Sequence, residues 1–199
     1  STDTVEIQAN DIDFSYFETE DFSNKATRLR GSVMILGPML ARFGRGFLPK
    51  PGGDKIGRRR LDTHIIGMQK LGATFENCNN YQKASAPSDG LKGTYMLLDE
   101  ASVTGTANII MAAVMAKGVT TIFNAACEPY IVQLCRMLVS MDLAQYGADQ
   151  RTDIHIKGCA GKQTGSDCAD QVSHAHASHG ERAHHRLGNH IILLLGVSG

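Results

Sequence analysis

The chain has 199 residues and a mass of 21.5 kDa, and its 20 Lys and Arg residues are balanced by 20 Asp and Glu residues. The hydrophobic share of 42% is enough for a packed core and excludes full disorder, while 21 glycines without a sustained heptad exclude a coiled coil. The most apolar run, residues 191–197, is far shorter than the ~20 residues that a membrane-spanning helix needs, so no membrane span is expected.

The cysteines and the first residues bear on the compartment. Residues 1–11 contain neither the basic nor the apolar region of a signal peptide, and the missing initiator Met suggests a processed or cut start. The five cysteines form no C-x-x-C pair, and an odd, scattered set is typical of a reducing compartment. We therefore expect a cytoplasmic protein without a disulfide framework.

Two helices are predicted in the first third of the chain. Apolar residues at helical spacing predict a helix over 26–44, which the pair Gly37 and Pro38 bends or restarts. A loop rich in chain breakers follows over 44–60, and then a second helix over 62–71.

The second helix carries recognisable end signals. Asp62 or Thr63 is expected as its N-cap, because either side chain accepts a hydrogen bond from a free backbone N–H, and Gly72 suits its C-terminal end. Its inward-facing residues are expected to be Ile65, Ile66, Met68 and Leu71.

The middle of the chain alternates between strands and helices. Ser102 and Thr104 are expected to open the first of its helices and Gly118 to end it, while Pro129 fits the first turn of the last helix. The predicted order is strands over 73–77, 81–86 and 93–98, a helix over 104–117, a strand over 119–126 and a helix over 128–141.

A faint internal repeat sets the fold class. Helices 62–71 and 130–141 match in spacing at an offset of about 70 residues, which indicates an α/β domain built from repeated units. After Met141 the periodicity is lost, so we expect domains at 1–141 and 142–199, the latter a His-rich, non-native or frameshifted continuation that packs poorly over 147–190. The histidine spacing fits no zinc template, and no metal site is expected.

Charge is unevenly distributed. Residues 25–60 contain ten Lys and Arg residues against a single acid, Asp54. Such a block could hold an anionic ligand, while a solvated basic surface, the commoner case in proteins at large, stays open as the alternative. Nucleic acid is not expected as a partner, because only Phe43 and Phe47 are available there for stacking on bases.

The segment PGGDKIGRRRLDTH, residues 51–64, concentrates the candidate chemistry. It combines flexible glycines, one acid, several guanidinium groups and a helix start whose free N–H groups attract anions. This combination indicates a mobile lid over a phosphorylated substrate, and the segment is not a P-loop, because G-x-x-x-x-G-K-[ST] is absent.

Five separated motifs carry a resemblance to a known family. In order and in spacing they resemble UDP-N-acetylglucosamine 1-carboxyvinyltransferase, an enolpyruvyl transferase family of peptidoglycan precursor synthesis. The motifs are residues 28–44, 51–64, 71–73, 91–113 and 124–132.

The resemblance implies an inside-out α/β barrel built from repeated units of helices and short strands. It also implies a reaction without a cofactor, in which the enolpyruvyl group of phosphoenolpyruvate moves to the 3′-hydroxyl of UDP-N-acetylglucosamine and phosphate is released. Asp54 occupies the position of the proton donor, where many relatives have Cys. Because a carboxylate is a weaker nucleophile than a thiolate, the resemblance implies resistance to the epoxide antibiotic fosfomycin.

The resemblance further implies the residues that bind substrate. They are Arg30, Arg59, Arg60, Leu61, Asp62, Thr63, His64, Glu100, Ala101, Ser102 and Val103. Glu100 departs from the family, where Lys is common. Structural roles stay open for four of these residues: Arg30 on a solvated helix, Ser102 and Asp62 as helix caps, and His64 in packing.

Three functions remain open on the sequence. The first is the transfer to UDP-N-acetylglucosamine, the second is the related 3-phosphoshikimate 1-carboxyvinyltransferase, and the third is a non-catalytic anion-binding fragment. The lid segment favours the first. The 199 residues alone are expected to be inactive, because the resemblance places a Lys-Asn pair and a second domain outside them.

Overall fold

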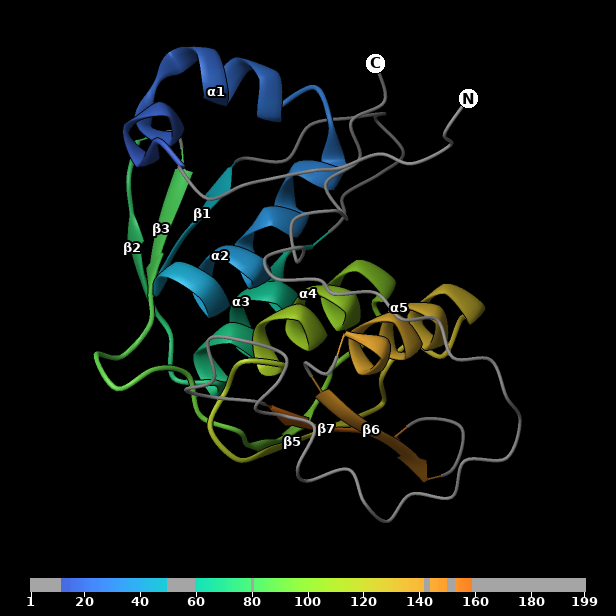
Figure 1. Ribbon diagram of the computed structural model, residues 1–199. Coiled ribbons are helices and arrows are strands. Elements are labelled where there is room, and N and C mark those ends of the chain that lie inside the picture. The colour runs from blue at the N-terminus through green and yellow to red at the C-terminus, as the bar shows by residue number, and fades with distance from the viewer. Residues whose placement is uncertain (1–11, 50–59, 80, 142–143, 150–152, 159–199) are drawn as a thin grey trace, which may run out of the picture.

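A layer of helices lies between two small sheets in the computed structural model, which describes residues 12–49, 60–79, 81–141, 144–149 and 153–158 (Figure 1). The helices are α1 Glu20–Ala26, α2 Leu36–Phe43, α3 Asp62–Lys70, α4 Val103–Ala113 and α5 Pro129–Ser140, with 3-10 turns η1 Phe14–Glu18 and η2 Arg30–Ile35. The strands are β1 Arg45–Pro49, β2 Thr74–Asn77, β3 Tyr81–Ser85, β4 Tyr95–Leu97, β5 Val119–Phe123, β6 Ala144–Asp149 and β7 Asp153–Gly158.

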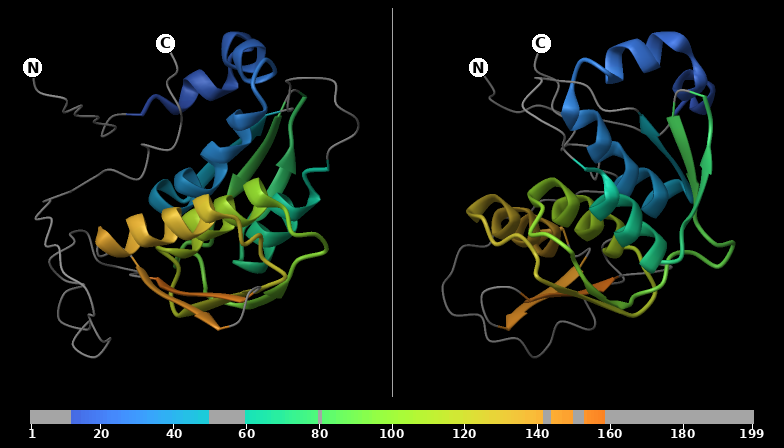
Figure 2. Two further views of the ribbon diagram at one scale, coloured as in Figure 1. Left: turned by 90° about the vertical axis from the view of Figure 1, so that its right-hand side faces the viewer. Right: turned by 180° about the vertical axis from the view of Figure 1, so that it is seen from behind.

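The two sheets differ in topology. The first is antiparallel with strand order β1-β3-β2, and the second has the order β4-β5-β7-β6. Strands β4 and β5 are parallel and are joined through α4, whereas β5–β7 and β6–β7 pair antiparallel. Figure 2 shows helices α2 to α5 lying between these sheets, so the helices are inside and the sheets outside. This confirms the inside-out α/β arrangement expected from the sequence.

Helix α4 forms the centre of this layer. Every residue from Gly105 to Ala113 is buried, and the helix packs against α2, α3 and α5. A helix surrounded on all sides needs mostly apolar residues on all faces, and the polar residues of this helix, Thr104, Thr106 and Asn108, have hydrogen-bond partners inside the protein. Its position makes α4 the element through which the other helices are held in register.

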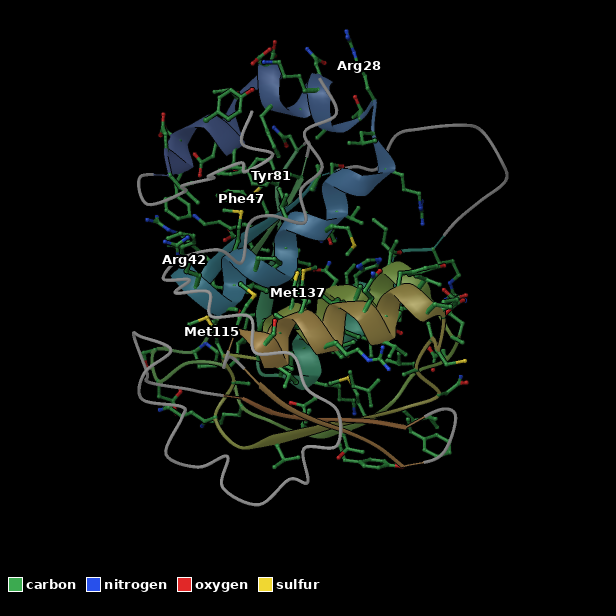
Figure 3. The ribbon with its side chains drawn as sticks, turned by 45° about the vertical axis from the view of Figure 1, so that its right-hand side comes forward. Arg28, Arg42, Phe47, Tyr81, Met115 and Met137 are labelled. Atoms are coloured by element: carbon green, nitrogen blue, oxygen red, sulfur yellow. The ribbon has the colours of Figure 1, made fainter. Side chains whose placement is uncertain are left out.

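An aromatic cluster, separate from the core around α4, packs Phe47 of the first sheet against the N-terminal segment. Phe47 of β1 stacks on Phe17 with ring centroids 5.0 Å apart and lies 5.5 Å from the ring of Tyr81 (Figure 3). Such contacts add to the burial of apolar area, so this cluster attaches the N-terminal segment to the sheet. Its remaining members are Ile35, Met39, Phe14 and Phe22.

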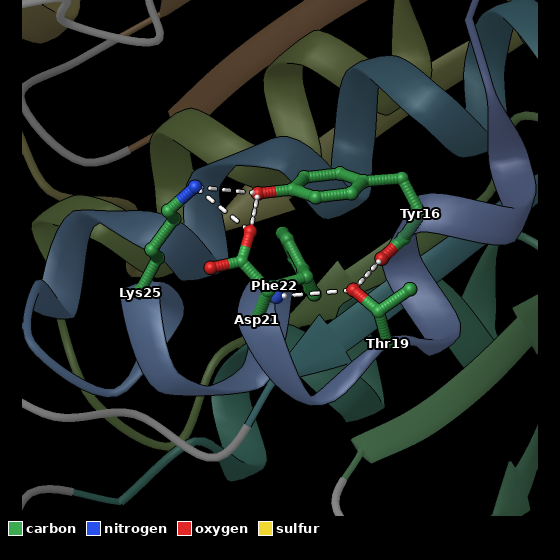
Figure 4. A network of polar contacts seen from close by, with 5 residues as sticks. All are labelled: Tyr16, Thr19, Asp21, Phe22 and Lys25. Carbon is green, nitrogen blue, oxygen red and sulfur yellow. Dashed lines mark hydrogen bonds and ion pairs between the residues drawn. The ribbon is translucent and has the colours of Figure 1, made fainter.

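Helix α1 begins with a side-chain cap (Figure 4). The Thr19 hydroxyl accepts from the Phe22 N–H at 3.2 Å and donates to the Tyr16 carbonyl at 2.7 Å. Asp21 accepts from the Tyr16 hydroxyl and the Lys25 ammonium, both at 2.8 Å. Because these charges are exposed, we expect them to orient the helix start while adding little to stability.

Most of the predicted elements are confirmed, including α3, α5 with Pro129 in its first turn, and strands β2 to β5. The helix expected over 26–44 begins only at Arg30, as η2 followed by α2, which begins at Leu36 just before the Gly37–Pro38 pair. Gly72 follows α3 with φ +100°.

One strand lies in the segment expected to be a loop, so that prediction is wrong for Arg45–Pro49. Strand β1 is an edge strand that buries Phe47 and Leu48, and a proline is tolerated at the end of an edge strand. Burial of its apolar residues outweighs the breakers around it.

The expected ends and inward face of two helices also need correction. Helix α3 has Leu61, not Asp62 or Thr63, at its N-cap position, with no side-chain cap. Of its expected inward-facing residues, Met68 and Leu71 are buried, whereas Ile65 and Ile66 are only half-buried. The rest of the buried face consists of Thr63, His64 and Gly67. Helix α4 ends at Ala113, earlier than expected, although the next residues remain in the core.

Strands β6 and β7 were not predicted. They extend the second sheet beyond β5, and the rest of the 142–199 region lies outside the described residues. Over the parts of the chain that the structure describes, none of the helices has the length and apolarity needed to cross a bilayer.

Candidate functional site

Three helix starts meet at one place in the structure, and the predicted site residues that the structure describes lie on or just before them. Arg30 opens η2, and its guanidinium donates to the carbonyl of Arg60, just before α3, at 3.5 Å. The Thr63 hydroxyl, in the first turn of α3, donates to the Glu100 carboxylate at 3.3 Å. Segments that are 30 to 40 residues apart in sequence are thereby brought together.

The start of α4 is capped by a side chain. Ser102 is its N-cap, and the Ser102 hydroxyl accepts from the Gly105 N–H at 3.2 Å. A Cβ at position 105 would lie 2.7 Å from Thr63 Cγ2, so glycine there lets α3 and α4 approach closely. The two helix starts lie side by side, and the free N–H groups of such ends favour an anion.

Charged groups surround these helix starts. Arg60 forms an exposed ion pair with Asp62, and the pKa of Arg60 is raised mainly by this hydrogen bond and further by Glu100 and Asp99. Glu100 stands where the resemblance leads us to expect Lys, so it cannot attract an anion through its charge. Its carboxylate instead accepts a hydrogen bond from the Thr63 hydroxyl. Arg30, which is half-buried, is the cation best placed between η2 and α3.

His64 lies beneath this surface. It is only 1% exposed, and burial, followed by the nearby Arg30 charge, lowers its pKa to about 4. The imidazole is therefore neutral near pH 7, and its ring nitrogens face Asn108 and Thr104. This geometry favours a packing role for His64 over direct contact with a ligand.

The other predicted residues divide by exposure. Leu61 and Val103 are half-buried and Ala101 is exposed beside Glu100, so that the 100–103 segment lies along the start of α4. Asp54 and Arg59 lie outside the described residues, and their roles stay predictions.

Asn108 and Thr104 were missed by the sequence reasoning. The sequence feature that could have revealed them is a polar side chain within an otherwise apolar helix. Such a side chain needs a hydrogen-bond partner when it is buried. Among the described residues, no group of three or more His, Cys, Asp or Glu residues is arranged to hold a metal ion. Burial raises the pKa of the Cys135 thiol to about 11, which leaves it unreactive.

Two substitutions at Ser102 separate its capping role from ligand binding. Ser102→Ala removes the cap and is expected to lower the free energy of unfolding by about 1 kcal/mol. Ser102→Asp keeps a capping oxygen but adds a negative charge, so it is expected to preserve stability while weakening anion binding. Urea unfolding and ligand titration of both variants check this, and unchanged anion affinity in Ser102→Asp would leave Ser102 as a cap only.

Comparisons with known proteins identify the family to which this chain belongs. Residues 6–175 match the profile of the family described as EPSP synthase (3-phosphoshikimate 1-carboxyvinyltransferase). A solved structure, the enolpyruvyl transferase NikO from Streptomyces tendae, superposes with a TM-score of 0.56 at 15% identity, covering 69% of this chain and 32% of that chain. This likeness supports the fold.

Curated relatives are closer in sequence. A UDP-N-acetylglucosamine 1-carboxyvinyltransferase from Porphyromonas gingivalis is 59% identical over 139 residues, which are 70% of this chain and 32% of that protein. One from Borreliella burgdorferi is 47% identical over 141 residues, again 32% of that protein. The chain thus spans about a third of the length of these relatives. On the family match over most of its length, the chain belongs to the EPSP synthase family of enolpyruvyl transferases.

Proposed function

We propose that this chain is part of an enzyme that transfers the enolpyruvyl group of phosphoenolpyruvate to the 3′-hydroxyl of UDP-N-acetylglucosamine and releases phosphate. The observation that carries this proposal is the meeting of Arg30, the start of α3 and the start of α4 at one surface. Because the chain spans 32% of its relatives' length, turnover is proposed for a protein of full length, in which these residues form part of the acceptor site.

The described residues suit the diphosphate of a sugar nucleotide. The N–H groups at the starts of α3 and α4 offer hydrogen-bond donors and the positive ends of two helix dipoles. Arg30 adds a guanidinium that can bind phosphate oxygens. The acids beside them, Asp62 and Glu100, are engaged with Arg60 and Thr63, which reduces their repulsion of an anion.

The reaction needs a proton donor and cations for the leaving phosphate. Protonation of the enol carbon and attack by the 3′-hydroxyl form a tetrahedral ketal, which eliminates phosphate while returning the proton. We propose Asp54 as the proton donor and Arg59 as a cation of this site, on the family resemblance of the 51–64 segment.

The related transfer to shikimate 3-phosphate is the second candidate function. The family profile carries that name. The relatives at 47% and 59% identity are named for the UDP-N-acetylglucosamine reaction, and we therefore favour the sugar nucleotide. With this assignment we also propose a role in peptidoglycan precursor synthesis, in the cytoplasm, and through it in cell shape and cell division.

A titration with both acceptors tests the proposed function. We expect saturable binding of UDP-N-acetylglucosamine with a Kd on the order of 1 mM, about −4 kcal/mol, and no binding of shikimate 3-phosphate. Arg30→Ala is expected to weaken binding about tenfold, because a charge-assisted hydrogen bond is lost.

Arg28→Ala is the matched control for this titration. Arg28 is exposed and its side chain points away from the rest of the protein (Figure 3), so its loss changes the net charge equally without touching the site. Equal effects of the two substitutions, or preference for shikimate 3-phosphate, would overturn the assignment.

Asp54 predicts a drug response in a full-length enzyme. The carboxylate is expected to resist alkylation by fosfomycin, and Asp54→Cys is expected to become sensitive, because a thiolate opens the epoxide far faster. Mass spectrometry of the lid peptide after incubation with the drug measures the adduct. Equal modification of both forms would contradict this account of the lid acid.

A further inference from the structure

The buried amide of Asn108 makes three hydrogen bonds to three different elements. Its Nδ2 donates to the Val33 carbonyl at 2.9 Å and to His64 Nδ1 at 3.0 Å, and its Oδ1 accepts from the Gly37 N–H at 2.7 Å. Asn108 is fully buried in α4. One side chain in the central helix thus bonds η2, α2 and α3 at once.

These contacts fix the orientation of the amide and the tautomer of the histidine. The Gly37 N–H can only donate, so the amide oxygen must face it and the NH₂ group must face Val33 and His64. His64 Nδ1 is then an acceptor, and the ring hydrogen is on Nε2, which lies 3.3 Å from the Thr104 hydroxyl oxygen in the first turn of α4.

The contact between Gly37 and Asn108 depends on a close approach of the α2 and α4 backbones. A Cβ at position 37 would overlap the Asn108 main-chain oxygen and lie 2.5 Å from its Oδ1. Only glycine lets the start of α2 approach α4 this closely. The close approach and the hydrogen bond from Gly37 therefore require each other.

The network lies directly under the proposed ligand surface. Val33 belongs to η2, the turn that Arg30 opens, and His64 lies in the first turn of α3, four residues after Arg60. Thr104 completes the connection to the start of α4. Each of the three helix starts that meet at the site is tied to Asn108 directly or through His64.

We infer that Asn108 is a positioning residue, which through its three hydrogen bonds holds η2, α3 and α4 in the register that directs Arg30 and both helix starts at one anion. This inference rests on the proposed function for the identity of the anion. The geometry of the network is independent of the proposed function, because the tautomer of His64 is set without any ligand.

The test combines two substitutions on the same helix. Asn108→Asp keeps the size and the acceptor for Gly37 but removes the NH₂ donor. Thr106→Val is the matched control, since Thr106 is also fully buried and accepts from the Ala126 N–H at 3.0 Å, a partner that belongs to none of η2, α2 and α3. Asn108→Ser, which keeps one donor and one acceptor, serves if the Asp variant does not fold.

Two readouts are measured on the full chain. Ring ¹⁵N NMR is expected to show His64 as the Nε2–H tautomer in the wild type and in Thr106→Val, and as the Nδ1–H or doubly protonated form in Asn108→Asp. UDP-N-acetylglucosamine affinity, from NMR titration, is expected to fall about tenfold in Asn108→Asp, less in Asn108→Ser, and to stay unchanged in Thr106→Val despite a similar loss of melting temperature.

The outcomes separate this inference from the proposed function. An Nδ1–H tautomer in the wild type would overturn the network, and wild-type affinity in a folded Asn108→Asp would overturn the positioning role. If the wild type shows the Nε2–H tautomer but binds no UDP-N-acetylglucosamine, the proposed function fails, and with it the claim that Asn108 positions this ligand's site.

Discussion

Replacing Gly37 by alanine is expected to lower the free energy of unfolding by about 3 kcal/mol, at the upper end for overpacking in a core. The added Cβ would overlap the main-chain oxygen of Asn108, which belongs to the buried central helix and cannot move away as a flexible side chain would. Relief of the overlap would also break the hydrogen bond from the Gly37 N–H to Asn108 Oδ1.

Urea unfolding of Gly37→Ala beside Gly31→Ala checks this expectation. Gly31 is exposed, and a Cβ there would meet only the Leu29 side chain at 3.7 Å, so that substitution is expected to change stability by less than about 0.5 kcal/mol. Similar stabilities of the two variants would show that α2 and α4 are not in the close contact described above.

Stability is expected to fall as the pH is lowered from about 6.5 to about 4, by up to about 3 kcal/mol, because of His64. Burial, and then the Arg30 charge, holds the pKa of His64 at about 4 in the folded protein. Above pH 6.5 neither state binds a proton, so the full stability is present. Below it the unfolded chain gains a proton that the folded chain refuses, and stability is lost.

The measurement is the free energy of unfolding in urea at several pH values for the wild type and His64→Gln. Glutamine does not titrate, so the acid-side loss is expected to be smaller in this variant, while contributions from all other groups are shared and cancel in the difference. Parallel pH profiles would mean that His64 takes up its proton at the same pH in the folded and unfolded states, contrary to its burial and its contact with Asn108.

The helices were predictable from the sequence where apolar spacing coincides with burial, as for α5 and its N-terminal Pro129. The inward face of α3 was not, because it is lined by Thr63, His64 and Gly67. Hydrophobic periodicity finds apolar residues, whereas this face packs through a buried polar network and a close approach of helices. Two isoleucines beside it, Ile65 and Ile66, were therefore misplaced.

The site could be predicted only in part. The resemblance named Arg30, the segment before α3 and the segment before α4, and the structure brings these together. No local pattern predicts contacts between segments this far apart in sequence. Asn108 was missed for the same reason, because its partners are 44, 71 and 75 residues away. Strand β1 was missed because glycine and proline outweigh Phe47 and Leu48 in any local reading, while burial decides its structure.

The most direct test of the acceptor site is a map of backbone amide shifts on addition of UDP-N-acetylglucosamine. The account predicts saturable shifts at the starts of α3 and α4, at residues 61–64 and 103–105, and at Arg30. It predicts no shifts on α5, at residues 133–139, which lies away from these starts. Shifts confined to other surfaces, or equal shifts throughout the described chain, would contradict the claim that the three helix starts form the sugar-nucleotide site.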